Sequence, residues 1–267
     1  MERNDWYGAY VFDMDGTVYL GDELLPTVAR TLGRIREKGI PVRFLSNNPT
    51  KTPRQYLEKL TRLGLPAEES EIVNTLVSTT GWLQRHRPDA VVFPIGEPPL
   101  VRALSEAGIE LSDDPAKIDI VLASYDRSFE YRKLQTAFDA LWYHKRAVLM
   151  STNPDKYCPF PGGRGEPDCA SIVAAIEACT GVKCERTFGK PSALMVQVIM
   201  DSLGVSAADA VMVGDRLMTD IAMGRLAGMD AALVLTGDSR AEDIAEVPAE
   251  LRPTRVLEYL SDLLPRP

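Results

Sequence analysis

The chain has few of the side chains that build disulfide frameworks or soft-metal sites. It holds only four cysteines and two histidines in 267 residues. The cysteines are Cys158, Cys169, Cys179 and Cys184. Their spacing contains no CxxC pair and fits no dense disulfide framework. Two histidines leave no room for a histidine-based metal site. We therefore expect free thiols in a reducing compartment.

Long apolar runs and an excess of positive charge are also absent. No run approaches the roughly 18 apolar residues of a membrane span. Residues 1–6 lack the basic start and apolar stretch of a signal peptide. The formal net charge of −8 argues against nucleic acid or an anionic membrane surface as a partner, because both require a basic protein surface. We expect a soluble, cytoplasmic protein that binds a small molecule.

What the chain does contain is a regular alternation of short β-rich runs and helical patterns. This alternation predicts an α/β fold built on a mostly parallel sheet. Predicted strands cover 8–13, 41–46, 90–95, 118–124, 146–151, 210–214 and 231–235. Predicted helices cover 27–38, 52–63, 71–86, 97–107, 130–143, 170–180, 191–203 and 218–227.

The most informative stretch is Val-Phe-Asp-Met-Asp-Gly-Thr at residues 11–17. An apolar run that ends in Asp13 and Asp15 predicts a buried strand that presents both side chains on one side. Gly16 permits a sharp exit from that strand. Two carboxylates held this close repel each other unless a cation neutralises them. Mg²⁺ suits such a site because it prefers carboxylate oxygens and often shares them with a substrate phosphate.

Further polar side chains follow other predicted strands, where open α/β sheets bind ligands. The strand 41–46 ends in Ser46, followed by Asn47 and Asn48. The Ser46 hydroxyl and the following backbone amides are suited to hold a phosphate oxygen. An ordinary Ser/Asn turn would explain the same residues.

Two more positions carry charge beside a predicted helix. Lys190 precedes the helix 191–203 and can neutralise a phosphate, although an exposed surface lysine is the commoner case. Asp215 follows the strand 210–214 and is placed to complete an oxygen-rich metal site with Asp13. Asp220 would bind a metal-bound water, orient Lys190, or cap the helix that begins near it.

The order of these motifs resembles the haloacid dehalogenase (HAD) superfamily. The order is DxDGT at 13–17, a strand that ends in Ser46, Lys190, and GDxxxTD at 214–220. The resemblance covers about residues 6–78 and 184–264. Asp15, two positions after the expected nucleophile Asp13, resembles the phosphatase form. Dehalogenases lack an acid there, and P-type ATPases carry threonine. The resemblance implies a Rossmann-like core with a parallel sheet.

The interval between Asn48 and Lys190 is far longer than a short crossover needs. It resembles the inserted α/β cap domain of class II, subtype IIA, as in the NagD and 4-nitrophenyl phosphatase-like group. We therefore expect a discontinuous core domain at 1–78 and 184–267 and a cap domain at 79–183. Caps of this subfamily often pair, so a homodimer formed through the cap is an open expectation.

The resemblance also implies roles for the motif residues. Asp13 would be the nucleophile and Asp15 the general acid and base. The Asp13 and Asp215 carboxylates and the Asp15 backbone carbonyl would hold Mg²⁺. Phosphate oxygens would bind Ser46, Asn47, Asn48 and Lys190. The substrate would be a small phosphorylated metabolite, such as a sugar phosphate, nucleoside monophosphate or glycerol phosphate.

Specificity is expected from the cap loop at about 153–170. Its candidate residues are Asn153, Asp155, Cys158 and Asp168, with Glu166 beside them. Asp168 is equally suited to be the N-cap of the helix 170–180. The charges around Lys59 and Arg62, and Arg127 and Lys133, are interpreted as solvated surface charge.

Two other functions stay open at this point. Asp15 also permits a phosphotransferase or mutase, in which an acceptor other than water takes the phosphoryl group. A catalytically silent binding protein on the same scaffold is the other alternative. The intact set Asp13, Asp15, Lys190 and Asp215 makes silence the weaker interpretation.

Overall fold

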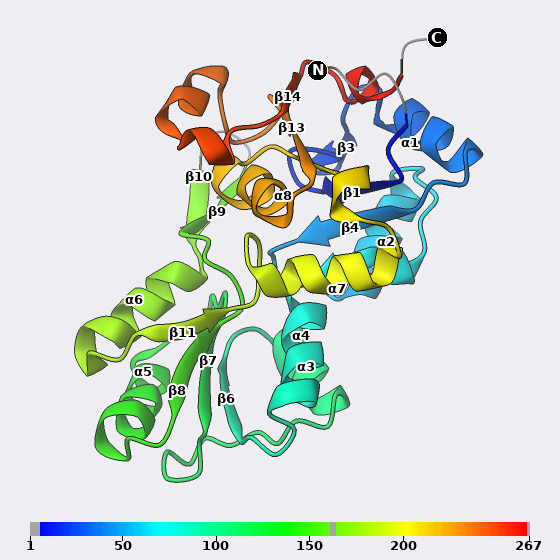
Figure 1. The fold of residues 1–267 in the computed structure, drawn as a ribbon. Coiled ribbons are helices and arrows are strands. Elements are labelled where there is room, and N and C mark those ends of the chain that lie inside the picture. Colours follow the sequence, from blue (N-terminus) through cyan, green and yellow to red (C-terminus); the bar gives the residue numbers. More distant parts are fainter. Residues whose placement is uncertain (1–5, 161–163, 266–267) are drawn as a thin grey trace. The chain divides into compact units, whose positions relative to one another are not determined.

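The computed structural model describes residues 6–160 and 164–265, and these fall into two compact units (Figure 1). The first unit holds residues 1–46, 53–73 and 190–267. The second unit holds residues 47–52 and 74–189, so it is inserted into the chain of the first. Gly162 and Gly163, which belong to the predicted specificity loop, lie outside the described residues.

The described part of the first unit is built on a six-stranded sheet in the order β14-β13-β12-β1-β4-β5. Its strands are β1 (Ala9–Asp13), β4 (Val42–Ser46), β5 (Ile72–Asn74), β12 (Ala210–Gly214), β13 (Asp230–Val234) and β14 (Arg255–Leu257). β1 pairs in parallel with both β4 and β12, and β13 pairs in parallel with β12 and β14. The predicted α/β fold with a parallel sheet is therefore confirmed.

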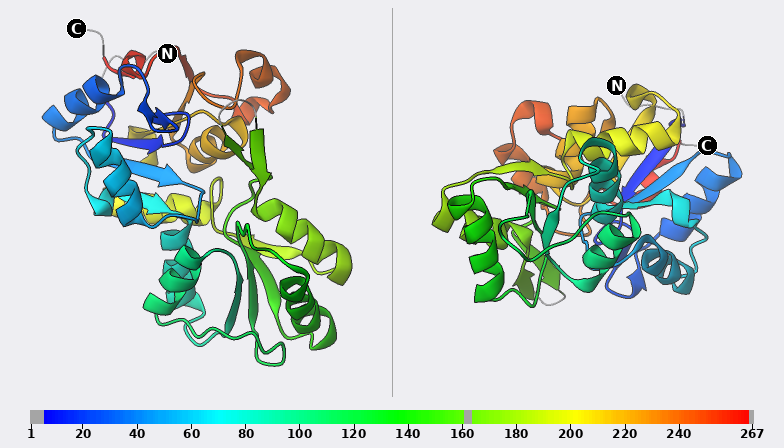
Figure 2. Two further views of the ribbon diagram at one scale, coloured as in Figure 1. Left: turned by 180° about the vertical axis from the view of Figure 1, so that it is seen from behind. Right: turned by 90° about the horizontal axis from the view of Figure 1, so that it is seen from below.

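Helices cover both faces of this sheet, which is why its central strands β1 and β12 are buried along their whole length. Alternate residues of β1 face opposite ways: Tyr10 and Phe12 join one apolar cluster, and Ala9 and Val11 join another. The first cluster includes residues of α1 (Val28–Glu37) and α2 (Pro53–Arg62). The second includes residues of α7 (Ala193–Leu203) and α8 (Ala222–Ala227). Figure 2 shows the blue strands of this unit between the blue helices and the yellow helix α7.

The strand order changes direction at β1. The next strands of the chain, β4 and β5, lie on one side of it, and β12, β13 and β14 lie on the other. In open α/β sheets, ligands bind at the carboxyl ends of strands beside such a switch point. Asp13 ends β1, Ser46 ends β4, and Asp215 directly follows β12. The fold thus brings three of the predicted site residues to one edge of one sheet.

The second unit contains its own four-stranded parallel sheet among the described residues, in the order β11-β8-β7-β6. These strands are β6 (Val92–Ile95), β7 (Ile120–Ala123), β8 (Val148–Ser151) and β11 (Cys184–Thr187). The helices of this unit are α3 (Thr75–His86), α4 (Pro98–Glu106), α5 (Tyr131–Phe138) and α6 (Cys169–Thr180). Its apolar core combines the β6, β7 and β8 strands with α5 and α6.

The predicted helix 71–86 begins later than expected. Residues Ile72–Asn74 form β5, and α3 starts only at Thr75. The β-branched Ile72 and Val73 favour a strand, and the side chain of Asn74 accepts a hydrogen bond from the Val77 amide at 3.2 Å, which caps the helix. A short apolar run beside a helical pattern carries too little periodicity to separate the two elements.

Several short elements were not predicted. They are the hairpin strands β2 (Tyr19–Leu20) with β3 (Glu23–Leu24), the hairpin strands β9 (Tyr157–Phe160) with β10 (Arg164–Pro167), and the edge strands β11 and β14. Two predicted helices also end or begin in a π-helical turn, at Asp139–Tyr143 and Leu217–Ile221. None of the described helices combines the length and apolar character that crossing a bilayer requires.

Candidate active site

Three buried carboxylates meet at the carboxyl edge of the six-stranded sheet. They belong to Asp13 at the end of β1, Asp215 just after β12, and Asp220 in the π-helical turn that follows. One oxygen from each lies within 4.8 Å of the others. Three carboxylates that are this close together and buried from solvent repel one another strongly when ionised, so the cluster requires positive charge beside it.

Lys190 supplies part of that charge. Its side chain is 3 % exposed and its Nζ donates to Asp13 Oδ1 and lies 2.7 Å from Asp220 Oδ1. Lys190 belongs to the first unit and precedes α7, which starts at Ala193 after the N-cap Ser192. The alternative of an exposed surface lysine is therefore wrong for this residue.

The electrostatics of the cluster show how tightly these groups are coupled. Burial raises the pKa of Asp13 well above its ordinary value; the Asp220 and Asp215 carboxylates add to this, and Lys190 opposes it. Burial, followed by the Asp220 charge, raises the pKa of Asp215 to about 7. Burial alone would lower the pKa of Lys190, but the Asp13 and Asp220 carboxylates raise it above its usual value. The repulsion among the three carboxylates thus adds to the effect of burial, and Lys190 opposes it.

Asp215 is held by the loop that follows β13. The amide of Asp238 donates to Asp215 Oδ2 at 2.7 Å, and the Thr236 hydroxyl donates to the Gly16 carbonyl at 2.6 Å. Gly16 has φ +87°, so the turn after Asp15 requires a residue without Cβ strain. The other oxygen, Asp215 Oδ1, is buried and has no hydrogen-bond partner among the described residues. A buried carboxylate oxygen left in this way is a ready ligand for a cation.

Asp220 makes the contacts that two of the three roles considered for it require. It pairs with Lys190, as described above, and its Oδ2 accepts a hydrogen bond from the Arg216 amide at 3.1 Å. The second contact orders the turn between Asp215 and the π-helical segment. Orienting Lys190 and capping the turn therefore occur together.

Asp15 differs from Asp13 in its surroundings. β1 ends at Asp13, and Asp15 lies beyond it with an exposed side chain. Its carboxylate is outside the group formed by Asp13, Asp215 and Asp220. The expectation that one buried strand carries both acids is thus wrong, because β1 ends at Asp13 and the exposed Asp15 directly precedes the turn at Gly16. Instead, Asp15 Oδ2 accepts a hydrogen bond from the Tyr19 hydroxyl at 3.3 Å.

Ser46 lies where the sequence predicts it, at the buried end of β4. Its hydroxyl shares a hydrogen bond with the Tyr56 hydroxyl at 2.9 Å. One turn further along α2, Lys59 Nζ lies 3.6 Å from the centre of the Tyr19 ring. Lys59 is only 7 % exposed, so its interpretation as solvated surface charge is wrong. Its apolar stem packs inside the unit and its charge rests on an aromatic face.

Asn47 and Asn48 fall in the second unit. The Asn47 carbonyl accepts a hydrogen bond from the Thr75 hydroxyl at 3.2 Å. Asn48 Oδ1 accepts from both the amide and the hydroxyl of Thr50, at 2.9 and 2.7 Å. Asn48 thus orders a turn through its own side chain. Phosphate binding by these two amides stays a prediction.

The predicted specificity residues all lie in the second unit. Asn153 is buried, and its Oδ1 accepts from the Asp155 amide at 2.9 Å. Asp168 caps α6 by accepting from the Cys169 amide at 2.6 Å, so the N-cap interpretation is confirmed. Cys158 lies on β9, opposite Glu166 of β10. Substrate selection by these residues stays a prediction.

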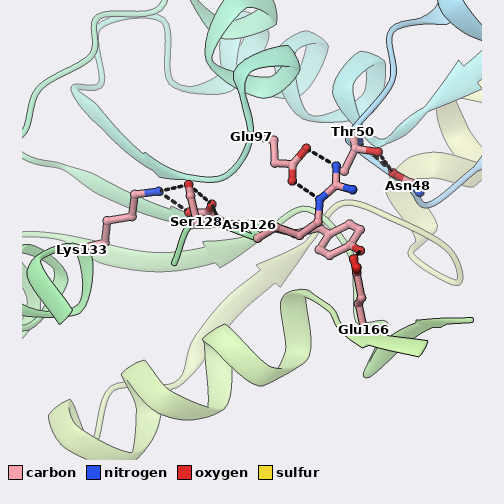
Figure 3. A network of polar contacts seen from close by, with 9 residues as sticks. Asn48, Thr50, Glu97, Asp126, Ser128, Lys133 and Glu166 are labelled. Carbon is pink, nitrogen blue, oxygen red and sulfur yellow. Dashed lines mark hydrogen bonds and ion pairs between the residues drawn. The ribbon is translucent and has the colours of Figure 1, made fainter. Parts of the chain in front are cut away.

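Polar contacts of the second unit involve Glu97, Asp126 and Glu166 (Figure 3). The Tyr125 hydroxyl donates to Glu166, and Arg127 makes a two-pronged contact with Glu97 at 2.5 and 2.7 Å. Lys133 pairs with the buried Asp126 at 2.5 Å. Arg127 and Lys133 are therefore partners of acids within the unit. Their interpretation as solvated charge is wrong for Lys133, whose side chain is 25 % exposed.

Five residues that support this site were not predicted as part of it from the sequence. They are Tyr19, Tyr56, Lys59, Thr236 and Gly237. A signal for the last two existed, because Thr236 and Gly237 follow the apolar strand β13 just as the other site residues follow theirs. For Tyr56 and Lys59, the spacing of three on α2 placed them on one helix face, but no local pattern separates a buried lysine from an exposed one.

Chemically, the cluster offers hard oxygen ligands, a buried cation and a hydroxyl at one sheet edge. Carboxylates with an unpartnered oxygen suit a divalent cation such as Mg²⁺. Lys190 and Ser46 suit an anion with several oxygens. The arrangement thus fits a ligand that carries phosphate with a bound cation.

Comparisons with known proteins point the same way. A model of haloacid dehalogenase-like hydrolases matches residues 10–110, and a HAD-hydrolase-like model matches residues 187–263. A 5'-nucleotidase of Bacillus subtilis is 32% identical over 97% of this chain and 98% of its own. An acid sugar phosphatase of Staphylococcus aureus is 34% identical over 89% of this chain and 90% of its own. The crystal structure of a 4-nitrophenylphosphatase from Thermotoga maritima superimposes with a TM-score of 0.89, at 33% identity over 96% of both chains.

Proposed function

Because the chain belongs to the haloacid dehalogenase-like hydrolases, as its motifs predict, we propose that it is a Mg²⁺-dependent phosphatase of small phosphate monoesters. The names of its relatives, a 5'-nucleotidase and an acid sugar phosphatase, favour nucleoside monophosphates and sugar phosphates as substrates. The chain is a phosphoric monoester hydrolase by the same comparisons.

The observation that carries this proposal is the buried group formed by Asp13, Lys190, Asp215 and Asp220. A binding protein for phosphate needs cations and amide donors, not three acids at its centre. An attacking carboxylate, a cation site and a lysine for the phosphate oxygens together explain why the acids are there.

The residues present fit a magnesium ion. Asp215 Oδ1 is buried and unpartnered among the described residues, and the Asp13 carboxylate lies within reach of the same point. We propose that these two carboxylates and the Asp15 backbone carbonyl hold the ion. When bound, Mg²⁺ would neutralise negative charge on the transferring phosphoryl group.

The proposed reaction has two steps. Asp13 attacks the phosphorus; a bond forms between its carboxylate oxygen and phosphorus as the bond to the leaving oxygen breaks. Asp15 gives its proton to that leaving oxygen, so an alcohol departs. In the second step Asp15 takes a proton from water as the water oxygen attacks phosphorus. The bond to Asp13 then breaks and inorganic phosphate leaves.

The remaining side chains position the phosphoryl group. Lys190 and the Ser46 hydroxyl bind its non-bridging oxygens, and Asp220 keeps Lys190 directed toward Asp13. A loose phosphoryl-transfer transition state needs little covalent assistance, so this positioning supplies much of the rate enhancement.

A phosphate-release screen tests the proposal. The purified protein is incubated with nucleoside monophosphates, sugar phosphates, glycerol phosphate and 4-nitrophenyl phosphate, each with Mg²⁺ and with EDTA. We expect release that EDTA reduces by at least about 100-fold and that added Mg²⁺ restores, because the three acids lack a full counter-charge without the ion. The ranking of kcat/KM names the substrate class.

Two outcomes would contradict the proposal. Equal phosphate release in Mg²⁺ and in EDTA would show that the reaction does not depend on the metal. If folded protein in Mg²⁺ releases phosphate from none of the substrates, the proposed hydrolysis of these substrates is wrong. Adding alcohol acceptors and analysing products by phosphorus NMR then separates phosphotransfer from water as the acceptor.

A second prediction concerns Gly237. A Cβ at this position would lie 2.0 Å from Asp215 Oδ2, closer than any real Cβ contact, so Asp215 or the loop must move. We expect Gly237→Ala to lower Mg²⁺-dependent phosphate release by on the order of 100-fold or more, since small displacements of a positioned group are costly. Phosphate release at saturating Mg²⁺ measures it.

Gly33→Ala is the matched control. Gly33 lies in α1 of the same unit, and a Cβ there meets nothing within 4 Å. The substitution should leave release unchanged and should stabilise the helix by about 0.5–1 kcal/mol. Equal activity of the two alanine variants would show that Asp215 tolerates the displacement.

A further inference from the structure

Asp15 lies in a turn that Tyr19 closes. The Tyr19 amide donates to the Met14 carbonyl at 3.2 Å, and the Gly16 amide donates to the Tyr19 carbonyl at 2.8 Å. The Tyr19 hydroxyl then reaches back to Asp15 Oδ2 at 3.3 Å. One residue therefore holds both the backbone around Asp15 and one oxygen of its carboxyl group.

The Tyr19 side chain is itself fixed. It is fully buried, whereas Asp15 is exposed. Its ring belongs to the apolar cluster of the first unit, and its hydroxyl is the donor in the contact with Asp15. An exposed carboxyl held by a buried, immobile hydroxyl loses less rotational freedom when it reacts than a free one would.

A lysine of helix α2 also contacts the Tyr19 ring. Lys59 Nζ lies 3.6 Å from the ring centre, and Lys59 is 7 % exposed. A partly desolvated cation on an aromatic face is attracted by the negative face of the ring, and this attraction restrains both side chains. Tyr56, three residues earlier on the same helix, shares a hydrogen bond with Ser46. One face of α2 thus contacts Ser46 directly, through Tyr56, and contacts Tyr19, the partner of Asp15, through Lys59.

We propose that Tyr19 is a positioning residue for Asp15 and that Lys59 holds the Tyr19 ring in place. Tyr19 occupies Asp15 Oδ2, which leaves Oδ1 to carry the proton that moves to the leaving oxygen. This inference rests on the proposed phosphatase function, because it assigns a role within the first chemical step.

Leaving-group dependence separates this role from a merely structural one. An alkoxide leaves poorly unless it is protonated, while 4-nitrophenolate leaves readily without a proton. Loss of acid positioning therefore slows the hydrolysis of alkyl phosphates and leaves the hydrolysis of 4-nitrophenyl phosphate nearly unchanged. A general loss of folding or phosphate binding slows both equally.

The experiment measures kcat/KM of wild type, Tyr19→Phe and Lys59→Met on 4-nitrophenyl phosphate and on the alkyl phosphate that wild type hydrolyses fastest. We expect Tyr19→Phe to lower kcat/KM on the alkyl phosphate by about tenfold and kcat/KM on 4-nitrophenyl phosphate by less than about twofold. The tenfold loss is smaller than the full contribution of a general acid, because Asp15 itself remains. Lys59→Met should show the same split with a smaller amplitude, and it tests the inference if Tyr19→Phe does not fold.

Tyr7→Phe is the matched control. Tyr7 is also a buried tyrosine of the first unit, and its hydroxyl donates to the Asp230 carboxylate at 2.8 Å. Its removal should leave the ratio of the two kcat/KM values unchanged. Equal losses on both substrates in Tyr19→Phe, or no loss on either, would overturn the inference while leaving the phosphatase proposal intact. A wild type that releases phosphate from neither substrate would overturn the proposed function and this inference with it.

Discussion

Replacing Asp13 with asparagine is expected to abolish phosphate release and to leave the protein folded. The carboxamide is a poor nucleophile and cannot form the bond to phosphorus that the first step requires. Loss of an enzyme nucleophile typically costs on the order of 10⁴-fold or more in kcat. Phosphate release under saturating Mg²⁺ and the best substrate of the screen measures this loss.

The fold should survive because the substitution removes a buried acid and leaves Lys190 paired with Asp220. Burial and the Asp220 and Asp215 carboxylates raise the pKa of Asp13, which means that they disfavour its ionised form. Asparagine removes one of three repelling charges. Lys190 keeps its ion pair with Asp220 at 2.7 Å, so no uncompensated cation is left behind. We expect the free energy of unfolding to change by less than about 1 kcal/mol, as is usual when a change leaves no buried charge unpaired.

Asp201→Asn is the control for this pair of measurements. Asp201 is an exposed acid near the end of α7 in the same unit, so neither activity nor stability should change. An Asp13→Asn variant that is soluble, folded and nearly as active as wild type would remove Asp13 as the nucleophile. A variant that is inactive because it is unfolded would contradict the charge argument instead.

The long apolar strands and their polar ends were predictable from sequence. β1, β4 and β12 begin and end within one residue of their predicted limits, because buried parallel strands are continuous apolar runs. Since parallel strands share a carboxyl edge, Asp13, Ser46 and Asp215 were also predictable as neighbours. Lys190 was singled out from its place before a predicted helix, and the resemblance of the motif order assigned it to the site.

The remaining features depend on tertiary packing that no local pattern records. Lys59 has the sequence surroundings of an ordinary helical lysine, and only the fold places the Tyr19 ring beneath it. The departure of Asp15 from the strand depends on a turn closed by Tyr19, four residues later. The edge strand β11 carries the polar sequence Cys-Glu-Arg-Thr, and its strand character comes from pairing with β8. Each needs a partner from elsewhere in the fold.

Removing the charge of Lys190 should have a large effect on stability. Lys190→Met leaves the Asp13, Asp215 and Asp220 carboxylates buried together without their lysine. Leaving a buried charge unpaired typically costs about 3–5 kcal/mol of unfolding free energy. We expect a loss of this size in EDTA, measured by urea denaturation, and partial recovery in Mg²⁺ because a ligand of the native state stabilises it. Phosphate release should fall as well.

Lys183→Met is the matched control, because Lys183 also pairs with an acid at 2.7 Å but is 80% exposed. An exposed pair contributes at most about 1 kcal/mol, so this variant should unfold close to wild type. The double variant Lys190→Met/Asp220→Asn tests the cause. If unbalanced charge destabilises the single variant, removing one acid should recover stability without recovering phosphate release. If lost packing destabilises it instead, Asp220→Asn will recover nothing, and Mg²⁺ will stabilise the single variant no more than it stabilises wild type.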